Sequence, residues 1–420
     1  MQDNEKKPAL RFKGFTDPWE QRKLSELTSM HARIGWQNLR TSEFLDSGDY
    51  MLITGTDFDD GTVNYSTCHF VERERYEQDK NIQIRNGSIL ITKDGTLGKV
   101  AYVQSLSMPA TLNAGVFNVE IRNTSIVDER YLFQYLKAPF LMDYVDKKAT
   151  GGTIKHLNQN ILVDFPVVMP KKTEQVSIGN FFQRIDTLIT LHQRKYEKLV
   201  NIKKSMLDKM FPKNGASVPE IRFKGFTDPW EQRKLTNLCE KFTDGDWIEA
   251  KDQSDSGVRL VQTGNVGVTE YLDKPNNKKW ISFETFEQLH CEEVYPGDIL
   301  ISRLPEPAGR ACIMPNLGTK MITAVDCTIV RPNAVTSTRF LLQYLSSQAY
   351  FDAVNTCLAG GTRQRISRGN LAQFNVPIPS SKIEQEKIGE ILEKLDTLIT
   401  LHQREHIKPI LEVKRVKRNE

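Results

Sequence analysis

The chain has 420 residues, of which 39% are hydrophobic and 26% charged; this composition is typical of a soluble globular protein of two or three domains and excludes a disordered or fibrous one. Its net charge of +4 arises from 57 basic and 53 acidic residues, far less than the excess of a plainly basic nucleic-acid-binding domain. No stretch approaches the length of about 20 apolar residues that a membrane helix needs, and the first residues do not resemble a signal peptide.

The two halves of the chain repeat each other. Residues 11–24 recur unchanged as residues 222–235, and residues 186–194 recur unchanged as residues 396–404. Between these flanks the halves match only weakly, so the chain is a tandem duplication with a diverged middle in each copy. Matching flanks suggest the same task performed twice, and diverged middles suggest two different tasks.

The first predicted element is a mixed α/β domain over residues 1–171. Residues 88–92 form a short apolar run after a glycine, as strands do, and residues 132–144 carry apolar side chains at helical spacing. The same features return over residues 222–380, after a linker at residues 212–221. We therefore expect an α+β fold that contains two pseudo-repeated mixed α/β domains.

One long helix is predicted over residues 172–211. Its apolar residues and one histidine fall at alternating three- and four-residue steps, as in a coiled-coil seam; they are Ile178, Phe181, Ile185, Leu188, His192, Leu199, Ile202 and Met206. The second copy, residues 381–408, places on the same stripe Ile388, Ile391, Leu395, Leu398 and His402. We expect the two helices to pair antiparallel as a coiled-coil spacer between the domains. The alternative is that each helix packs on its own domain.

The end of the chain departs from the repeat. Pro409 stands where the first copy has Leu199, and an internal proline breaks a helix. We therefore expect the distal helix to end near residue 408 and residues 409–420 to form a charged tail. His192 and His402 are expected to be core histidines of the seam rather than ligands.

Familiar catalytic motifs are absent from the sequence. There is no Gly-x-Ser-x-Gly, His-Glu-x-x-His or Gly-x-Gly-x-x-Gly motif, and residues 95–100 fail as a phosphate loop because Val100 replaces the magnesium-binding hydroxyl. The six cysteines contain no Cys-x-x-Cys pair, so we expect no metal site and a reducing, cytoplasmic environment. No catalytic residue is predicted.

Loops rich in hydrogen-bond donors occur at matching places in the two halves. Arginine can pair with guanine, asparagine and glutamine can pair with adenine, and lysine mostly meets phosphate. The candidate DNA contacts of the first half are Lys93, Lys99, Thr153, Lys155, His156 and Asn158. Those of the second half are Arg303, Arg310, Arg363, Gln364, Arg365, Arg368 and Asn370. Solvated surface loops are the alternative interpretation.

The Gly-Phe-x-x-Pro-Trp-Glu opening of each half, the Gly-Gly-Thr segments and the Asp-Thr-Leu-Ile-Thr-Leu-His-Gln-Arg helices resemble the specificity subunit of type I restriction–modification systems. The resemblance covers nearly the whole chain, in order and in duplicate. It implies two target-recognition domains separated by two long antiparallel helices, a non-catalytic role and a place in the bacterial cytoplasm. Each domain would read one half of a split, asymmetric DNA target.

The same resemblance implies partners and cofactors. The partners would be double-stranded DNA, two methyltransferase subunits docked on the helices and two ATP-driven restriction subunits; S-adenosylmethionine, ATP and Mg²⁺ would belong to those subunits and no cofactor to this chain. The candidate partner-binding residues are Trp19, Trp230, Phe181, Ile185, Leu188, Leu191, Leu395, Leu398 and Leu401. A coiled-coil scaffold and a stand-alone DNA-modifying enzyme are the alternatives.

Overall fold

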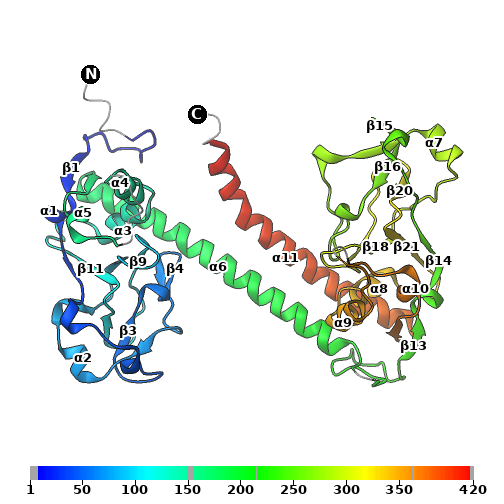
Figure 1. Ribbon diagram of the computed structural model, residues 1–420, viewed down its shortest axis with the longest axis horizontal. Coiled ribbons are helices and arrows are strands. Elements are labelled where there is room, and N and C mark those ends of the chain that lie inside the picture. The colour runs from blue at the N-terminus through cyan, green and yellow to red at the C-terminus, as the bar shows by residue number, and fades with distance from the viewer. Residues whose placement is uncertain (1–7, 149–155, 214, 362–363, 417–420) are drawn as a thin grey trace. The chain divides into compact units, whose positions relative to one another are not determined.

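A computed structural model describes residues 8–148, 156–213, 215–361 and 364–416 of the protein. The chain forms two compact units, Met1–Ile189 and Thr190–Glu420. Each unit contains one α+β domain, and the long helix α6 (Lys172–Met210) contributes residues to both units (Figure 1). The predicted α+β class and duplicated domain are confirmed.

The first domain is built on two four-stranded sheets. One sheet is antiparallel, and its strands in order are β2 (Thr28–His31), β11 (Val116–Ile121), β8 (Ile89–Thr92) and β9 (Val100–Tyr102). The other sheet has the order β6 (His69–Phe70), β3 (Met51–Ile53), β10 (Ala110–Leu112) and β7 (Gln83–Ile84). In this second sheet β3 and β10 run parallel, whereas the other neighbours run antiparallel.

The second domain repeats this plan. Its antiparallel sheet has the order β14 (Cys239–Asp244), β21 (Cys327–Pro332), β18 (Ile299–Ser302) and β19 (Ala311–Ile313). Its other sheet has the order β15 (Gln253–Ser254), β17 (Lys279–Ile281), β16 (Val258–Val261) and β20 (Met321–Thr323), with β16 and β20 parallel.

Strand β8 shows why the apolar runs of the sequence become strands. All four of its residues are buried, because successive side chains of a strand point to opposite faces and both faces of this strand are covered. Ile89 and Ile91 join one hydrophobic core of the domain, whereas Leu90 joins the other. Strand β18 divides its isoleucines and Leu300 between two cores in the same way.

A two-stranded ribbon joins the beginning and end of each domain. Strand β1 (Glu20–Lys23) pairs antiparallel with β12 (Pro166–Met169), and β13 (Glu231–Lys234) pairs antiparallel with β22 (Asn375–Ile378). The strands β1 and β13 have the same sequence, Glu-Gln-Arg-Lys, as part of the repeated opening. A small hairpin of β4 (Phe58–Asp59) and β5 (Thr62–Val63) completes the strands of the first domain among the described residues.

Short helices cover the sheets. Those of the first domain are α1 (Leu24–Leu27), α2 (Arg73–Glu77), α3 (Glu129–Lys137), α4 (Phe140–Lys148) and α5 (Gln159–Val163). Those of the second domain are α7 (Phe283–Gln288), α8 (Thr338–Tyr344), α9 (Gln348–Thr356) and α10 (Arg368–Ala372). Within the described ranges, no helix combines the length and the apolar character that spanning a bilayer requires.

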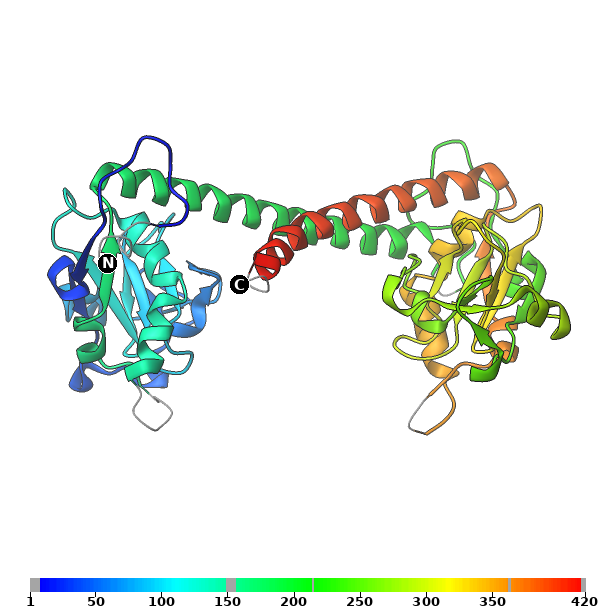
Figure 2. The same cartoon turned by 90° about the horizontal axis from the view of Figure 1, so that it is seen from above.

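Two long helices follow the two domains. Helix α6 is a single unbroken helix of 39 residues, and α11 (Lys382–Val416) has 35 residues (Figure 2). Helix α11 continues through Pro409, so the predicted end near residue 408 is wrong. The φ angle of proline, fixed near −65°, is compatible with a helical backbone, and the sequence argument gave too much weight to the hydrogen bond that proline cannot donate.

Candidate nucleic-acid interface

In the first domain, the loop between β8 and β9 carries two candidate lysines. The Lys93 backbone N–H donates to the carbonyl oxygen of Gly115 at 2.9 Å, and its ammonium nitrogen lies 5.5 Å from the centroid of the Phe117 ring. Lys99 is exposed, and its backbone N–H donates to the Thr92 hydroxyl at 2.9 Å. The loop backbone is therefore fixed to the sheet, while Lys99 lies on the surface.

The segment before α5 lies against this loop. The backbone N–H of Leu157 donates to the carbonyl oxygen of Lys93 at 2.8 Å, and the buried Leu157 side chain anchors the segment in the core. Beside it, His156 Nδ1 lies 2.6 Å from Asp94 Oδ1, with both side chains on the surface. Asn158 is exposed at the start of α5. The structure thus brings Lys93, His156 and Asn158 onto one loop cluster; the candidates Thr153 and Lys155 lie outside the described residues.

The equivalent loops of the second domain carry arginines beside two aspartates. The side chain of Arg365 is 62% exposed and has Nη1 3.8 Å from Asp326 Oδ1, and that of Arg368 is 45% exposed with Nε 3.6 Å from Asp244 Oδ2. These distances exceed those of hydrogen bonds, so the carboxylates attract the guanidinium groups without occupying their donors. The two arginines are therefore available at the surface.

The backbone holds this loop in place. Ala359 and Arg365 exchange two backbone hydrogen bonds, of 3.0 and 2.9 Å, across the turn. Asn370 Nδ2 donates to the carbonyl oxygen of Cys357 at 3.3 Å, so this candidate supports the loop from within, although its side chain is also exposed. Gln364 is exposed, and Arg363 lies outside the described residues.

Two of the candidate DNA contacts, Arg310 and Arg303, are corrected by the structure. Arg310 is buried and donates to four backbone carbonyl oxygens, those of Val266 at 2.6 Å, Leu304 at 2.7 Å, Thr263 at 2.9 Å and Pro307 at 3.0 Å. Its burial lowers the pKa of this guanidinium. These bonds show that Arg310 holds its loop together, a role that the spacing of glycine and arginine could not distinguish from phosphate binding.

Arg303 is the second corrected residue. It is also buried, and its Nη2 donates to the carbonyl oxygen of Val325 at 2.7 Å. Its Nε lies 3.4 Å from Asp244 Oδ1, the carboxylate that also attracts Arg368. Arg303 is therefore held inside the domain close to Asp244, and little of its side chain is accessible to DNA.

The aspartates of both clusters were not among the residues predicted from the sequence. Asp94 is paired with His156 in the first domain, and Asp244 and Asp326 lie beside the arginines in the second. Asp244 also accepts a hydrogen bond from the Thr328 hydroxyl at 2.9 Å, which fixes its orientation. Asp94 follows strand β8 and Asp326 precedes strand β21, and this position beside a buried strand was the signal in the sequence. A search for basic residues does not select acidic ones.

The start of each long helix is docked on its own domain by identical contacts. Glu174, which is buried, accepts two hydrogen bonds from Arg11 at 2.7 and 2.6 Å, and Glu384 accepts the same two from Arg222 at 2.7 and 2.9 Å. The repeated opening and the repeated helix therefore meet each other within each copy. This contact accounts for part of the sequence identity without any external partner.

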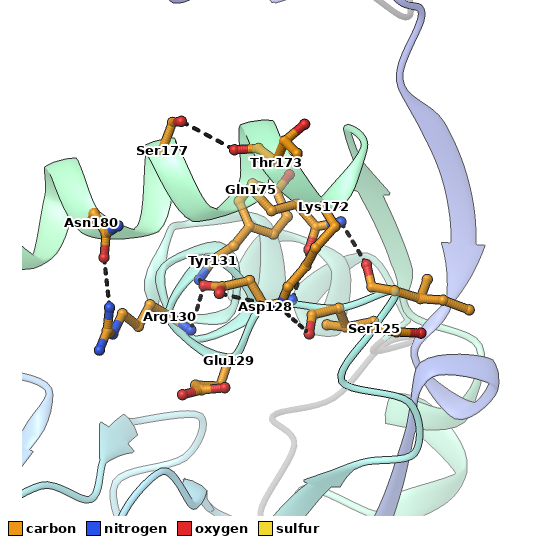
Figure 3. Close-up of polar contacts among 12 residues, drawn as sticks. Ser125, Asp128, Glu129, Arg130, Tyr131, Lys172, Thr173, Gln175, Ser177 and Asn180 are labelled. Atoms are coloured by element: carbon orange, nitrogen blue, oxygen red, sulfur yellow. Dashed lines mark hydrogen bonds and ion pairs between the residues drawn. The ribbon is translucent and has the colours of Figure 1, made fainter.

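A buried glutamine completes this joint. Gln175 accepts a hydrogen bond from the backbone N–H of Asp128 at 2.9 Å and donates to the carbonyl oxygens of Ile126 at 3.0 Å and Pro170 at 2.8 Å, as part of the polar network between α6 and the start of α3 (Figure 3). Gln385 makes the corresponding bonds with Ser337, Val335 and Pro379. The side chains of Asp128 and Lys172 and the Arg130–Asn180 pair extend the same network.

A glycine in each long helix allows the close approach. A Cβ atom at Gly179 would lie 2.8 Å from the backbone nitrogen of Tyr131, and one at Gly389 would lie 2.7 Å from that of Phe340.

Because backbone cannot move aside as a flexible side chain can, the substitutions Gly179→Ala and Gly389→Ala should each destabilise their unit by about 1–3 kcal/mol. Thermal unfolding would measure this loss. Gly369→Ala, whose Cβ would make only an ordinary contact at 3.7 Å, is the control and should leave the unfolding temperature unchanged or higher; an equal loss in all three variants would contradict the close-approach argument.

Several candidate partner-binding residues form an exposed apolar stripe on the long helices. The exposed fractions are 47% for Phe181, 55% for Leu188, 56% for Leu191, 42% for Leu398 and 51% for Leu401. The leucines belong to the nine-residue sequence that is identical in α6 and α11. Since internal packing does not require exposed leucines, these positions are suited to contact another molecule.

The other candidates on this surface are core or packing residues. Trp230 is buried and lies edge-to-face against Phe211, and Leu395 packs on the core of the second domain, so neither forms part of a free partner surface. Trp19 is half-buried, with its ring 6.3 Å from that of Tyr131, and Ile185 is half-buried on α6. Trp230 therefore belongs to a core, whereas its counterpart Trp19 remains partly exposed.

Within the second unit, the last part of α6 contacts α11. The rings of His192 and His402 have centroids 5.7 Å apart, and Lys203 forms an ion pair with Asp396. The residue numbers rise along one helix as they fall along the other, which is the antiparallel direction that the sequence predicted. His402 is buried, in agreement with the prediction of a core histidine, whereas His192, predicted in the same way, is only half-buried.

Comparisons with known proteins agree with this duplicated plan. Residues 16–201 and 227–411 each match the family model of the type I restriction modification DNA specificity domain. The specificity subunit of the type I restriction enzyme MjaVIII from Methanocaldococcus jannaschii is 23% identical over 342 residues, which cover 78% of this chain and 76% of that protein. The crystal structure of the S subunit of a type I restriction–modification system from M. genitalium has the same fold, with a TM-score of 0.63 at 15% identity over 98% of this chain and 97% of that one.

The family assignment rests on the two matches together. Each match includes a domain, its closing ribbon and most of the long helix that follows, and the pair covers well over half of the chain. The helix joints built on Glu174 and Glu384 show the same repeat in three dimensions. The chain therefore belongs to the family of type I restriction–modification DNA specificity proteins.

Proposed function

We propose that each domain of this non-catalytic specificity subunit reads one half of a split, asymmetric DNA target. The observation that carries the proposal is that each domain contacts its own long helix in the same way, whereas the surface loops of the two domains differ. The backbone N–H of Leu157 donates to Lys93 and that of Ile366 donates to Arg303, so Arg365 stands where the first domain has His156, and the buried Arg303 stands where it has Lys93. The exposed Arg365 and Arg368 lie beside Asp326 and Asp244, whereas His156 lies beside Asp94. Two domains of the same fold whose loops carry different hydrogen-bond donors are suited to read two different base sequences.

The charge pattern of the second domain supports base reading. An arginine fork can bond the O6 and N7 atoms of guanine, and the nearby carboxylates of Asp326 and Asp244 restrict Arg365 and Arg368 before DNA arrives. Because fewer side-chain conformations are then lost on binding, such pre-orientation favours affinity. In the first domain Lys99 is suited to phosphate, and His156 and Asn158 to base edges or phosphate.

The two long helices act, in this proposal, as a spacer and as a docking surface. The His192–His402 and Lys203–Asp396 contacts support an antiparallel coiled coil. The duplicated exposed leucines support the docking of two equal partners, which would be two methyltransferase subunits. Two restriction subunits complete the complex, and the partners supply S-adenosylmethionine, ATP and Mg²⁺ for adenine methylation and restriction.

The test is an exchange of the first domain. Residues 1–171 would be replaced by the corresponding domain of another family member, and methylated adenines would be mapped in a host that carries the partner subunits. The proposal expects two short tracts separated by an unread gap, with only one tract altered by the exchange. A change in both tracts, or a single contiguous target, would refute it. Unchanged methylation after the exchange would instead favour a scaffold without a role in recognition.

The spacer role makes a separate prediction about helix length. Inserting four residues after Arg194 of α6, with four after Gln403 of α11, lengthens each helix by about 6 Å, at 1.5 Å per residue. The preferred gap between the two tracts should increase by about one or two base pairs, because successive base pairs are about 3.4 Å apart. Selection from DNA with randomised gaps measures the preference. A gap that remains the same as in the unmodified protein would exclude the helices as the ruler.

A further inference from the structure

The first domain has an open apolar pocket at the joint with α6. Its volume is about 710 Å³, and its lining includes Trp19, Tyr131, Tyr135, Ile178 and Phe182. All of these residues belong to the first unit. Phe182 is 44% exposed although it is large and aromatic, and Trp19, Tyr135 and Ile178 are only half-buried.

The same place in the second domain is filled. The repeat aligns Trp19 with Trp230, Tyr131 with Phe340 and Tyr135 with Tyr344. Phe211, which directly follows α6, packs against all three of these counterparts, with ring centroids 6.1, 5.3 and 5.9 Å away. Met210 and Phe211 are both buried in this core.

The side chains at this place are buried in the second domain and more exposed in the first, as expected if the first domain lacks the segment that covers the second. Leu392, the counterpart of Phe182, is fully buried, and Ile388, the counterpart of Ile178, is 2% exposed. The frames around the two places are otherwise equal, since Gln134 and Gln343 donate to Asp186 and Asp396 at 2.6 and 2.8 Å. The difference in exposure therefore comes from Met210 and Phe211 at the end of α6, which cover this place in the second domain.

We propose that the pocket of the first domain binds an amphipathic helix of another polypeptide whose last turn carries methionine and phenylalanine. Residues 405–420 of this chain contain no methionine and no aromatic residue, so they do not repeat the segment that fills the second domain. Phe211 is itself 6% exposed in its own core and is not available to a second copy without unfolding it. The inference concerns a protein partner and does not rest on DNA recognition.

The test uses a fluorescent peptide with the sequence of residues 195–213 and the full-length chain. Fluorescence anisotropy should show saturable binding, and the peptide with Phe211→Ala should bind at least about tenfold more weakly, because it loses one buried aromatic side chain. In the chain, Phe182→Glu should abolish binding, whereas Phe182→Leu, which introduces the residue of the second copy, should preserve it. Thr187→Glu, at an exposed polar position of the same helix, is the matched control and should bind normally. Circular dichroism and thermal unfolding would verify that each variant is folded.

Several outcomes would overturn the proposal. They are the absence of saturable binding, equal binding by the Phe182→Glu chain, or equal weakening by Thr187→Glu. Tighter peptide binding after deletion of residues 405–420 would identify the chain's own tail as the occupant. Self-association of the chain that is lost with Phe182→Glu, measured by light scattering, would identify a second copy instead.

Discussion

Replacing Arg365 and Arg368 by alanine should remove discrimination at one half of the DNA target and leave the other half read as before. A bidentate arginine–guanine pair contributes about 1–3 kcal/mol of discrimination against a wrong base, which is about 5- to 150-fold per contact. Both side chains are exposed, and their distances to Asp326 and Asp244 leave the donors free. Binding to DNA libraries with single base changes, in the complex with the methyltransferase, would measure the effect.

Lysine substitutions separate base reading from charge at these positions. Arg365→Lys and Arg368→Lys keep the positive charge but lose the planar fork, so discrimination should fall nearly as far as in the alanine variants. Lys99→Ala in the first domain is the contrasting control. We propose that Lys99 contacts phosphate, so its loss should weaken binding to all sequences equally and reduce the salt dependence by about one unit of slope. Uniform weakening by the arginine variants would show that these residues contact phosphate rather than bases.

Removing the buried glutamine of the helix joint should produce a large loss of stability. Gln385→Ala would leave the backbone N–H of Ser337 and the carbonyl oxygens of Val335 and Pro379 without their hydrogen-bond partner. Unsatisfied buried groups cost about 1–3 kcal/mol each, and partial access of water to the cavity limits the total to about 3 kcal/mol. Gln175→Ala should have a similar effect in the first unit, because its three bonds are equivalent.

Hydrogen exchange localises this effect as well as measuring it. The amide of Ser337 should exchange faster in Gln385→Ala, and the amide of Asp128 should exchange faster in Gln175→Ala, because these are the protons that lose their acceptor. The exposed neighbour Glu386 provides the control, and Glu386→Ala should change neither exchange nor unfolding temperature. If the glutamine and Glu386 variants were equally stable, the joint would not depend on this side chain.

The repeat made much of the fold predictable. Identical flanks fixed the two domains and both long helices, since a period of half the chain length does not arise without duplicated structure. The end of α11 was not predictable from Pro409, because the cost of a proline depends on what else holds the helix. The alternative of helices packed on their own domains also proved partly correct, since Glu174 and Glu384 dock each helix start.

The candidate site was less predictable than the fold. Arg310 and Arg365 belong to similar glycine-containing loops, yet one is buried under four carbonyl contacts and the other is exposed. Burial depends on which distant segments contact a loop, as Val266 contacts Arg310. The local composition of the loop does not indicate such contacts. The aspartates were not predicted for the same reason, because their partners lie far away in sequence, as His156 does from Asp94, Arg365 from Asp326 and Arg368 from Asp244.

The glycine contact at the start of each long helix has a consequence for how such proteins acquire new targets. Because Gly179 and Gly389 contact the same backbone positions of their domains, an incoming domain that has this edge and the repeated opening can fit the helix. Recombination between related genes within the repeated stretches would therefore deliver a complete reader already compatible with its helix. Selection can then act on the loops alone, without a period in which the protein is poorly folded.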